Sequence, residues 1–228
     1  MAKINHLGTL AATAGALVAV GLVVLMLVAA GGTAAGAAPK AAPKFQTITK
    51  TFTNTSAIAI PIQGKATPYP SEINVGGFNR GKIKDVNLSL KDFSHYNPED
   101  VAVLLQGPKG QDAIVMSDVG GPGPDVYHIT LVLDDEAASP LPDKAEVSSG
   151  TFKPTQGNVD SGKPRPSVFP GPAGFPPYAQ ALSVFDGTNP NGTWSLFVFD
   201  DSTSTGEQPN TQKFAGGWSI EIQAKVKK

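Results

Sequence analysis

The chain has 228 residues, of which 40% are hydrophobic, enough to bury the core of one domain or of two small ones. Its 18 lysines and arginines nearly balance 19 aspartates and glutamates, so the overall charge offers no basic field for nucleic acid. Cysteine is absent, which excludes disulfides, thiolate zinc sites and cysteine nucleophiles.

The amino-terminal segment has the three parts of a secretory signal peptide. Lys3 precedes an apolar run that is densest over 16–30, and the small residues "GGTAAGAA" follow before Pro39. We expect residues 1–37 to be the signal, with cleavage after Ala35 or Ala37. The alternative is an uncleaved membrane anchor through residues 7–30. Either reading predicts a secreted or cell-surface protein.

Residues 38–44 are predicted to form a linker, because the prolines and lysines of "PKAAPK" disfavour a packed strand. The folded domain is expected to span residues 45–228. It opens with period-two patterns that are typical of strands. Their apolar positions are Ile58, Ile60 and Ile62, then Val86, Leu88 and Leu90, then Val101, Val103 and Leu105.

Further strands are predicted along the rest of the chain. They cover residues 113–116, 128–133, 183–185, 194–199 and 218–226. The last one alternates most clearly, with one apolar face and one polar face. Turn sequences rich in Gly and Pro separate the runs, with a long Pro/Gly-rich loop over 154–177. Eight or so short strands favour a two-sheet sandwich.

The two tryptophans occupy similar settings, each after a glycine and at the start of a strand. We expect Trp194 and Trp218 to anchor the core, and their strands to pair as a hairpin across the polar loop 200–216. The alternative role for these rings is a platform on which a sugar stacks.

The sequence contains few of the residue patterns that catalysis requires. Beyond the export segment, histidine occurs at His95 in "DFSHYNPED" and His128 in "DVYHITL". No Gly-x-Ser-x-Gly nucleophile turn is present, and the two histidines show no zinc-binding spacing. A hydrolase would require one of them to lie beside a serine in a cleft.

The segment "HYNPEDVAVLLQGPKG" from His95 to Gly110 resembles the P domain, or homo B domain, of proprotein convertases and related bacterial proteins. The resemblance extends through "SGTFKP" and "LSVFDGTNPNGTWSLFVFDD" over most of the chain after residue 45. One departure is Val101, where the family has leucine. The residues that carry the signature are His95, Asp100, Pro108, Gly110, Trp194 and Trp218.

The resemblance implies a jelly-roll-like β-sandwich of about eight or nine strands, which usually follows a protease domain, supports its folding and often binds calcium. No catalytic domain fits between the export segment and residue 45. We therefore expect a stand-alone, non-catalytic module. Its expected partner is an extracellular or cell-surface protein such as a protease. Nucleic acid is not expected, and membrane contact is expected through an uncleaved N-terminal segment alone.

Carboxylates at strand ends are candidate calcium ligands, since hard cations prefer oxygen. Asp118 and Asp125 flank the "VGGPGP" loop, and Asp134 and Asp135 end the next strand, so a meander would bring the four together. Asp200 and Asp201 form a weaker second candidate. The alternative is that these acids are solvated turn formers.

Three functions follow from the sequence. The first is a module that binds another protein through its loops, within a serine-type endopeptidase system whose activity is carried by the partner. The second is a hydrolase. The third is carbohydrate binding by exposed rings, for which the candidates are Tyr69, Tyr96, Phe175 and Tyr178.

Overall fold

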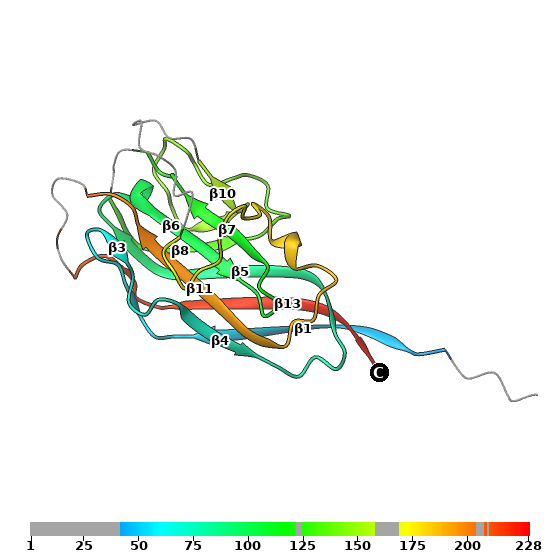
Figure 1. The fold of residues 1–228 in the computed structure, drawn as a ribbon. Helices are drawn as coiled ribbons and strands as arrows, with labels where there is room; N and C mark the ends of the chain where they lie inside the picture. Colours follow the sequence, from blue (N-terminus) through cyan, green and yellow to red (C-terminus); the bar gives the residue numbers. More distant parts are fainter. Residues whose placement is uncertain (1–41, 122–124, 158–168, 204–207, 209) are drawn as a thin grey trace, which may run out of the picture. The chain divides into compact units, whose positions relative to one another are not determined.

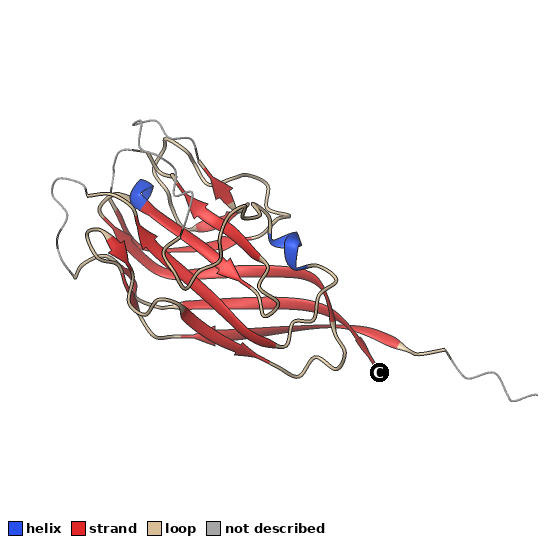
Figure 2. Ribbon diagram, in the orientation of Figure 1, coloured by secondary structure: helices blue, strands red, loops and turns tan. Residues whose placement is uncertain are grey.

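The computed structural model describes residues 42–121, 125–157, 169–203, 208 and 210–228. Ala42–Lys228 form one compact unit, in which two β-sheets enclose a common core (Figures 1 and 2). The predicted all-β sandwich is confirmed. The export segment and residues 38–41 of the linker lie outside the described residues. Within the part that is described, no helix is long and apolar enough to cross a membrane.

The first sheet is built around the long strand β5, and its main path runs β1-β13-β5-β12-β2. β8 pairs with the other edge of β5, and β9 pairs with β8. The strands are β1 (Phe45–Asn54), β2 (Ile58–Ala59), β5 (Lys82–His95), β8 (Val126–Leu133), β9 (Gly150–Phe152), β12 (Lys213–Phe214) and β13 (Trp218–Lys227).

The second sheet runs β10-β7-β6-β11-β3, and β4 also pairs with β11. Its strands are β3 (Gly64–Lys65), β4 (Ser71–Val75), β6 (Val101–Gln106), β7 (Asp112–Ser117), β10 (Thr155–Gln156) and β11 (Gly192–Asp200). Two short 3-10 turns, η1 (Pro98–Asp100) and η2 (Leu182–Phe185), lie between strands.

The main core follows the predicted alternation. Along β13, Ile220, Ile222 and Ala224 are buried while the residues between them are exposed, because one face of the strand packs against the opposite sheet. Trp194 and Trp218 are fully buried in this core, as expected for large aromatic anchors.

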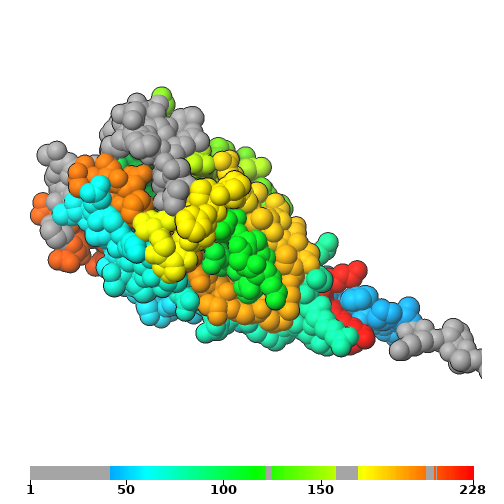
Figure 3. Space-filling model, in the orientation of Figure 1, coloured from blue at the N-terminus to red at the C-terminus, as the bar shows by residue number. Residues whose placement is uncertain are grey.

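A second apolar cluster covers the outer face of β6. Ala102 and Leu104 are as buried as Val101, Val103 and Leu105, which face the main core. The reason is that Phe169 and Ala173 of the proline-rich loop pack onto the outer face. Figure 3 shows the part of this loop that follows residue 168, in yellow, beside the green atoms of the β6–β7 region. Burial on both faces explains why the sequence "VAVLL" is apolar throughout.

Three local predictions are wrong. Residues 183–185 belong to η2 and not to a strand, because the backbone N–H groups of Leu182 and Ser183 bond to a side chain. The strand at Ile58 ends at Ala59. The tryptophan strands form no hairpin: β11 pairs with β3, β4 and β6, whereas β13 pairs with β1 and β5 in the other sheet.

Candidate functional site

A buried polar cluster lies where the ends of β5 and β11 meet η1. His95 Nε2 is 3.1 Å from Oδ2 of Asp200, and both side chains are fully buried. The backbone N–H of Asn97 donates to His95 Nδ1 at 3.1 Å. Asn97 Nδ2 donates to Asp100 Oδ2 at 2.9 Å. We call His95, Asn97, Asp100 and Asp200 the histidine cluster.

The hydrogen bonds of the histidine cluster define its protonation. Because His95 Nδ1 accepts a backbone N–H, the ring proton is assigned to Nε2, which donates to Asp200. Burial raises the pKa of Asp200, and the charge of Asp100 raises it further, against the lowering effect of the bonds from His95 and the Ser202 N–H. Through its hydrogen bond to Asp200, His95 links the end of β5 in one sheet to the end of β11 in the other.

The hydrogen bonds of the two histidines test the prediction that a hydrolase site would place one of them beside a serine. Both ring nitrogens of His95 are engaged within the histidine cluster. His128 Nδ1 lies 2.7 Å from Asp92 Oδ1 on the surface. The two residues lie where the pairing of β5 with β8 shifts register, and their φ angles are 55° for His128 and 57° for Asp92. Among the described residues, neither imidazole is hydrogen-bonded to a serine hydroxyl, which a Ser-His-Asp arrangement needs.

A cavity of about 130 Å³ adjoins the histidine cluster and is lined by Ser94, His95, Tyr96, Tyr127, Gln208, Thr211 and Gln212. Gln212 is 1% exposed, and within the described residues neither Oε1 nor Nε2 of its amide has a hydrogen-bond partner. An unpaired buried polar group costs about 1–3 kcal/mol. This amide is therefore the clearest sign that water or a ligand group completes the cavity.

The aromatic residues proposed for sugar binding do not form one platform. Tyr69 and Tyr178 pack in the second apolar cluster, and their hydroxyls donate to the carbonyls of Pro170 and Gly174. Tyr96 is 37% exposed at the cavity, and it is joined there by Tyr127, which sequence reasoning missed. Tyr127 donates to a carboxylate oxygen of Asp125.

Phe175 is 85% exposed in the proline-rich loop.

The aspartates proposed as one calcium site are separated. Asp125 precedes β8 and Asp134 follows it, so the eight-residue strand places them at its opposite ends. The prediction that a meander brings them together is wrong for this pair. Asp118 is buried and accepts a bond from Ser117 Oγ.

Asp135 and Asp134 have local roles. Both carboxylate oxygens of Asp135 accept backbone N–H groups of η2, at 2.9 and 2.8 Å. Asp134 Oδ1 accepts the N–H of Glu136. In the second predicted pair, Asp200 belongs to the histidine cluster, and the Asp201 N–H donates to the carbonyl of Asp100. No group of three or more His, Cys, Asp or Glu side chains in the described ranges is arranged to hold a metal.

Asp134 nevertheless has acidic neighbours that sequence reasoning missed. Burial raises the pKa of Asp85, and the charges of Asp134, Asp186 and Asp135 add to this effect. A hydrogen bond with Asp134 raises the pKa of Glu136. We call Asp85, Asp134, Glu136 and Asp186 the acidic group, because each is electrostatically coupled to another of these carboxylates or to Asp135.

The remaining signature residues build turns and core. Gly110 has a φ of +81° and donates to the carbonyl of Gly107, closing the turn between β6 and β7. Pro108 packs on Gly192, where an added Cβ would lie 2.6 Å from the proline ring. The indole N–H groups of Trp194 and Trp218 donate to the Pro190 carbonyl and to Ser71 Oγ, each at 2.9 Å.

A second and larger cavity, of about 480 Å³, is lined by apolar residues such as Ile60, Pro61 and Ile62 together with Lys65 and Asn210. The segment 210–212 thus contributes to both cavities.

No family profile and no curated protein matches the chain. Two solved structures are similar. A serine protease of Aeromonas sobria has a TM-score of 0.36 and 14% identity, over 81% of this chain and 28% of that chain. The same protease in complex with the chaperone ORF2 gives a TM-score of 0.37 and 14% identity, over 79% of this chain and 27% of that chain. The chain spans little more than a quarter of those proteins, and the P-domain assignment stays a prediction.

Proposed function

We propose that residues 45–228 form an exported, non-catalytic module of the P-domain type, which binds an extracellular protein and supports a protease that carries the activity. The observation in favour is that the signature residues hold the sandwich together. His95 joins β5 to β11, and Pro108 packs the turn after β6 against Gly192. These residues therefore stabilise the domain itself, which is the role that the resemblance gives them.

The test uses residues 42–228, which form a compact unit. The purified domain is immobilised and exposed to the culture supernatant of the producing cells, and the retained serine hydrolases are labelled with a fluorophosphonate probe. We expect one retained protease whose thermal half-life is longer with the domain than without it. Casein hydrolysis by the domain alone, or retention without any effect on half-life, would contradict the proposal.

Calcium belongs to the same proposal. The four aspartates first considered do not fit one ion, because Asp125 lies at the far end of β8 from Asp134. The acidic group is the location we propose instead, although its described residues form no preassembled metal site, so calcium would have to draw the carboxylates together. Burial, and then the charge of Asp134, raise the pKa of Asp85, and a cation would relieve the charge repulsion.

A further inference from the structure

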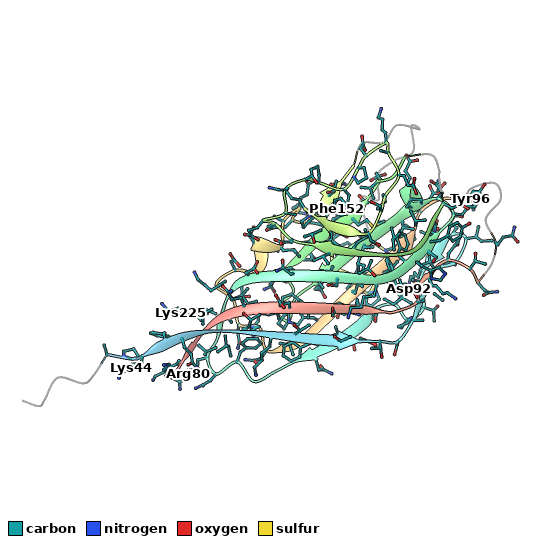
Figure 4. The ribbon with its side chains drawn as sticks, turned by 180° about the vertical axis from the view of Figure 1, so that it is seen from behind. Lys44, Arg80, Asp92, Tyr96, Phe152 and Lys225 are labelled. Carbon is teal, nitrogen blue, oxygen red and sulfur yellow. The ribbon has the colours of Figure 1, made fainter. Side chains whose placement is uncertain are left out.

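Basic side chains gather at one end of the sandwich. The N–H of Lys228 donates to the Lys44 carbonyl at 2.9 Å, so the two ends of the described unit lie together. Figure 4 shows Lys44, Arg80 and Lys225 at this end, and Tyr96 and Asp92 at the other. We call Lys44, Arg80, Lys82, Lys225, Lys227 and Lys228 the basic end; all six are exposed.

The sheet register places like charges side by side in the basic end. Lys225 on β13 lies directly opposite Lys82 on β5. Its alternation on β13 also keeps Lys225 and Lys227 on the outer face, because Ala224 and Val226 are in the core. Cross-strand pairs of like charge are unfavourable. An anionic surface against this end would remove that repulsion.

Two of the carboxylates near the basic end lie further along the strands, and a third, Asp186, precedes Gly187, whose N–H donates to the Ile83 carbonyl beside Lys82. Asp85 is opposite Gln223, and Glu221 is opposite Asn87. Asp85 and Glu221 are therefore several residues along the strands from the point where Lys44 and Lys228 meet. The positive charge at the tip of the sandwich is left uncompensated by these two acids.

An exposed aromatic ring completes the surface. Phe45 opens β1, is 50% exposed and lies opposite Lys227. The Nζ atom of Lys225 stands 4.9 Å from the centre of its ring. Lysines around an aromatic side chain form the combination that favours the headgroup region of a bilayer, where the ring enters the interface and the amines meet phosphates.

In the chain, the predicted export segment precedes the described domain and is joined to it through residues 38–44. The apolar run ends before Pro39, and residues 38–44 can span at most about 25 Å before Phe45. We propose that the basic end docks on a bilayer that contains anionic phospholipids. This inference does not rest on the proposed function, and it applies whether the export segment is cleaved or retained.

The test is co-sedimentation of residues 42–228 with vesicles of phosphatidylcholine alone and with about 30% phosphatidylglycerol. We expect binding to the anionic vesicles, and its loss as salt rises well above about 0.1 M. Lys82→Ala with Lys227→Ala should weaken binding about 30-fold, from the typical contribution of a lysine at an anionic surface. Phe45→Ser should weaken it further.

The matched control replaces Lys91 and Lys213, which lie toward the opposite end of β5, with alanine. This control removes the same charge and is expected to bind as the wild type does. Equal binding to neutral vesicles, equal losses in both double variants, or absence of binding to anionic vesicles at low salt would each overturn the proposal. So would binding to double-stranded DNA without binding to vesicles.

Discussion

His95 Nε2 and Asp200 Oδ2 are 3.1 Å apart, and they join the last residue of β5 in one sheet to the last residue of β11 in the other. The pair is fully buried, so its charge state is coupled to folding. A contact of this kind fixes how the two sheets meet at the cavity.

Asp200 should make the protein less stable as pH rises. Burial holds its folded-state pKa above the ordinary 3.8, so the folded state binds more protons than the unfolded state between these two values. The stability that Asp200 contributes is therefore fully present below about pH 3.8 and is lost as the pH rises through the raised pKa. Urea unfolding of the wild type and of Asp200→Asn at a series of pH values measures this.

Asparagine at position 200 keeps an oxygen that can accept from His95 but does not ionise. The free energy of unfolding of the wild type, relative to Asp200→Asn, is expected to fall across this window. Two parallel curves would show that Asp200 does not titrate differently on folding.

Trp218 should be energetically coupled to Ser71. Trp218→Phe removes the indole N–H that donates to Ser71 Oγ, and Ser71→Ala removes the acceptor. Each change should lower the free energy of unfolding by about 1–3 kcal/mol, because each leaves a buried polar group without this partner. The double variant should cost less than the sum, with a coupling of at least about 0.5 kcal/mol.

The matched cycle pairs Trp194→Phe with Ser71→Ala. The Trp194 indole bonds to the Pro190 carbonyl, so these two changes should add. Equal coupling energies in the two cycles would mean that the Trp218–Ser71 bond is not responsible.

The alternating strands could be predicted from the sequence because one face of each is exposed to solvent and the other is buried in the core. Residues 86–90 and 218–226 show this pattern and are strands in the structure. Strand pairing was not predictable in the same way. β11 and β13 follow each other closely in the chain but join different sheets, since their partners β4 and β1 come from the other end of the sequence.

The cavity and the basic end escaped sequence reasoning for a similar reason. Gln212 lies in a polar loop sequence, where nothing marks one amide as buried. The lysines of the basic end come from separate stretches of a chain whose total charge is −1, and they meet only through the register of β13 with β1 and β5.

Gln212→Leu tests whether the buried amide binds anything. With an empty cavity, leucine removes two unpaired polar atoms at similar volume, and the free energy of unfolding should rise by about 1 kcal/mol. With water or a ligand group bonded to the amide, the same change should be destabilising. Gln223→Leu on the exposed face of β13 is the control and should change stability by less than about 0.5 kcal/mol. Urea unfolding measures all three proteins.

Calcium should raise the thermal unfolding midpoint of residues 42–228 relative to chelator, since an ion that binds the folded state alone stabilises it by mass action. Asp134→Asn should abolish this rise, because Asp134 is coupled to Asp85 and Glu136 in the acidic group. Asp125→Asn should retain it, because residue 125 lies at the other end of β8.

Asp135→Ala should lower the midpoint in calcium and in chelator alike, by the equivalent of about 1 kcal/mol, because its oxygens cap the N–H groups of η2. This separates a turn-forming carboxylate from an ion-binding one. If calcium and chelator give the same wild-type midpoint, and elemental analysis finds no calcium retained through chelation, the acidic group serves only the turns around it.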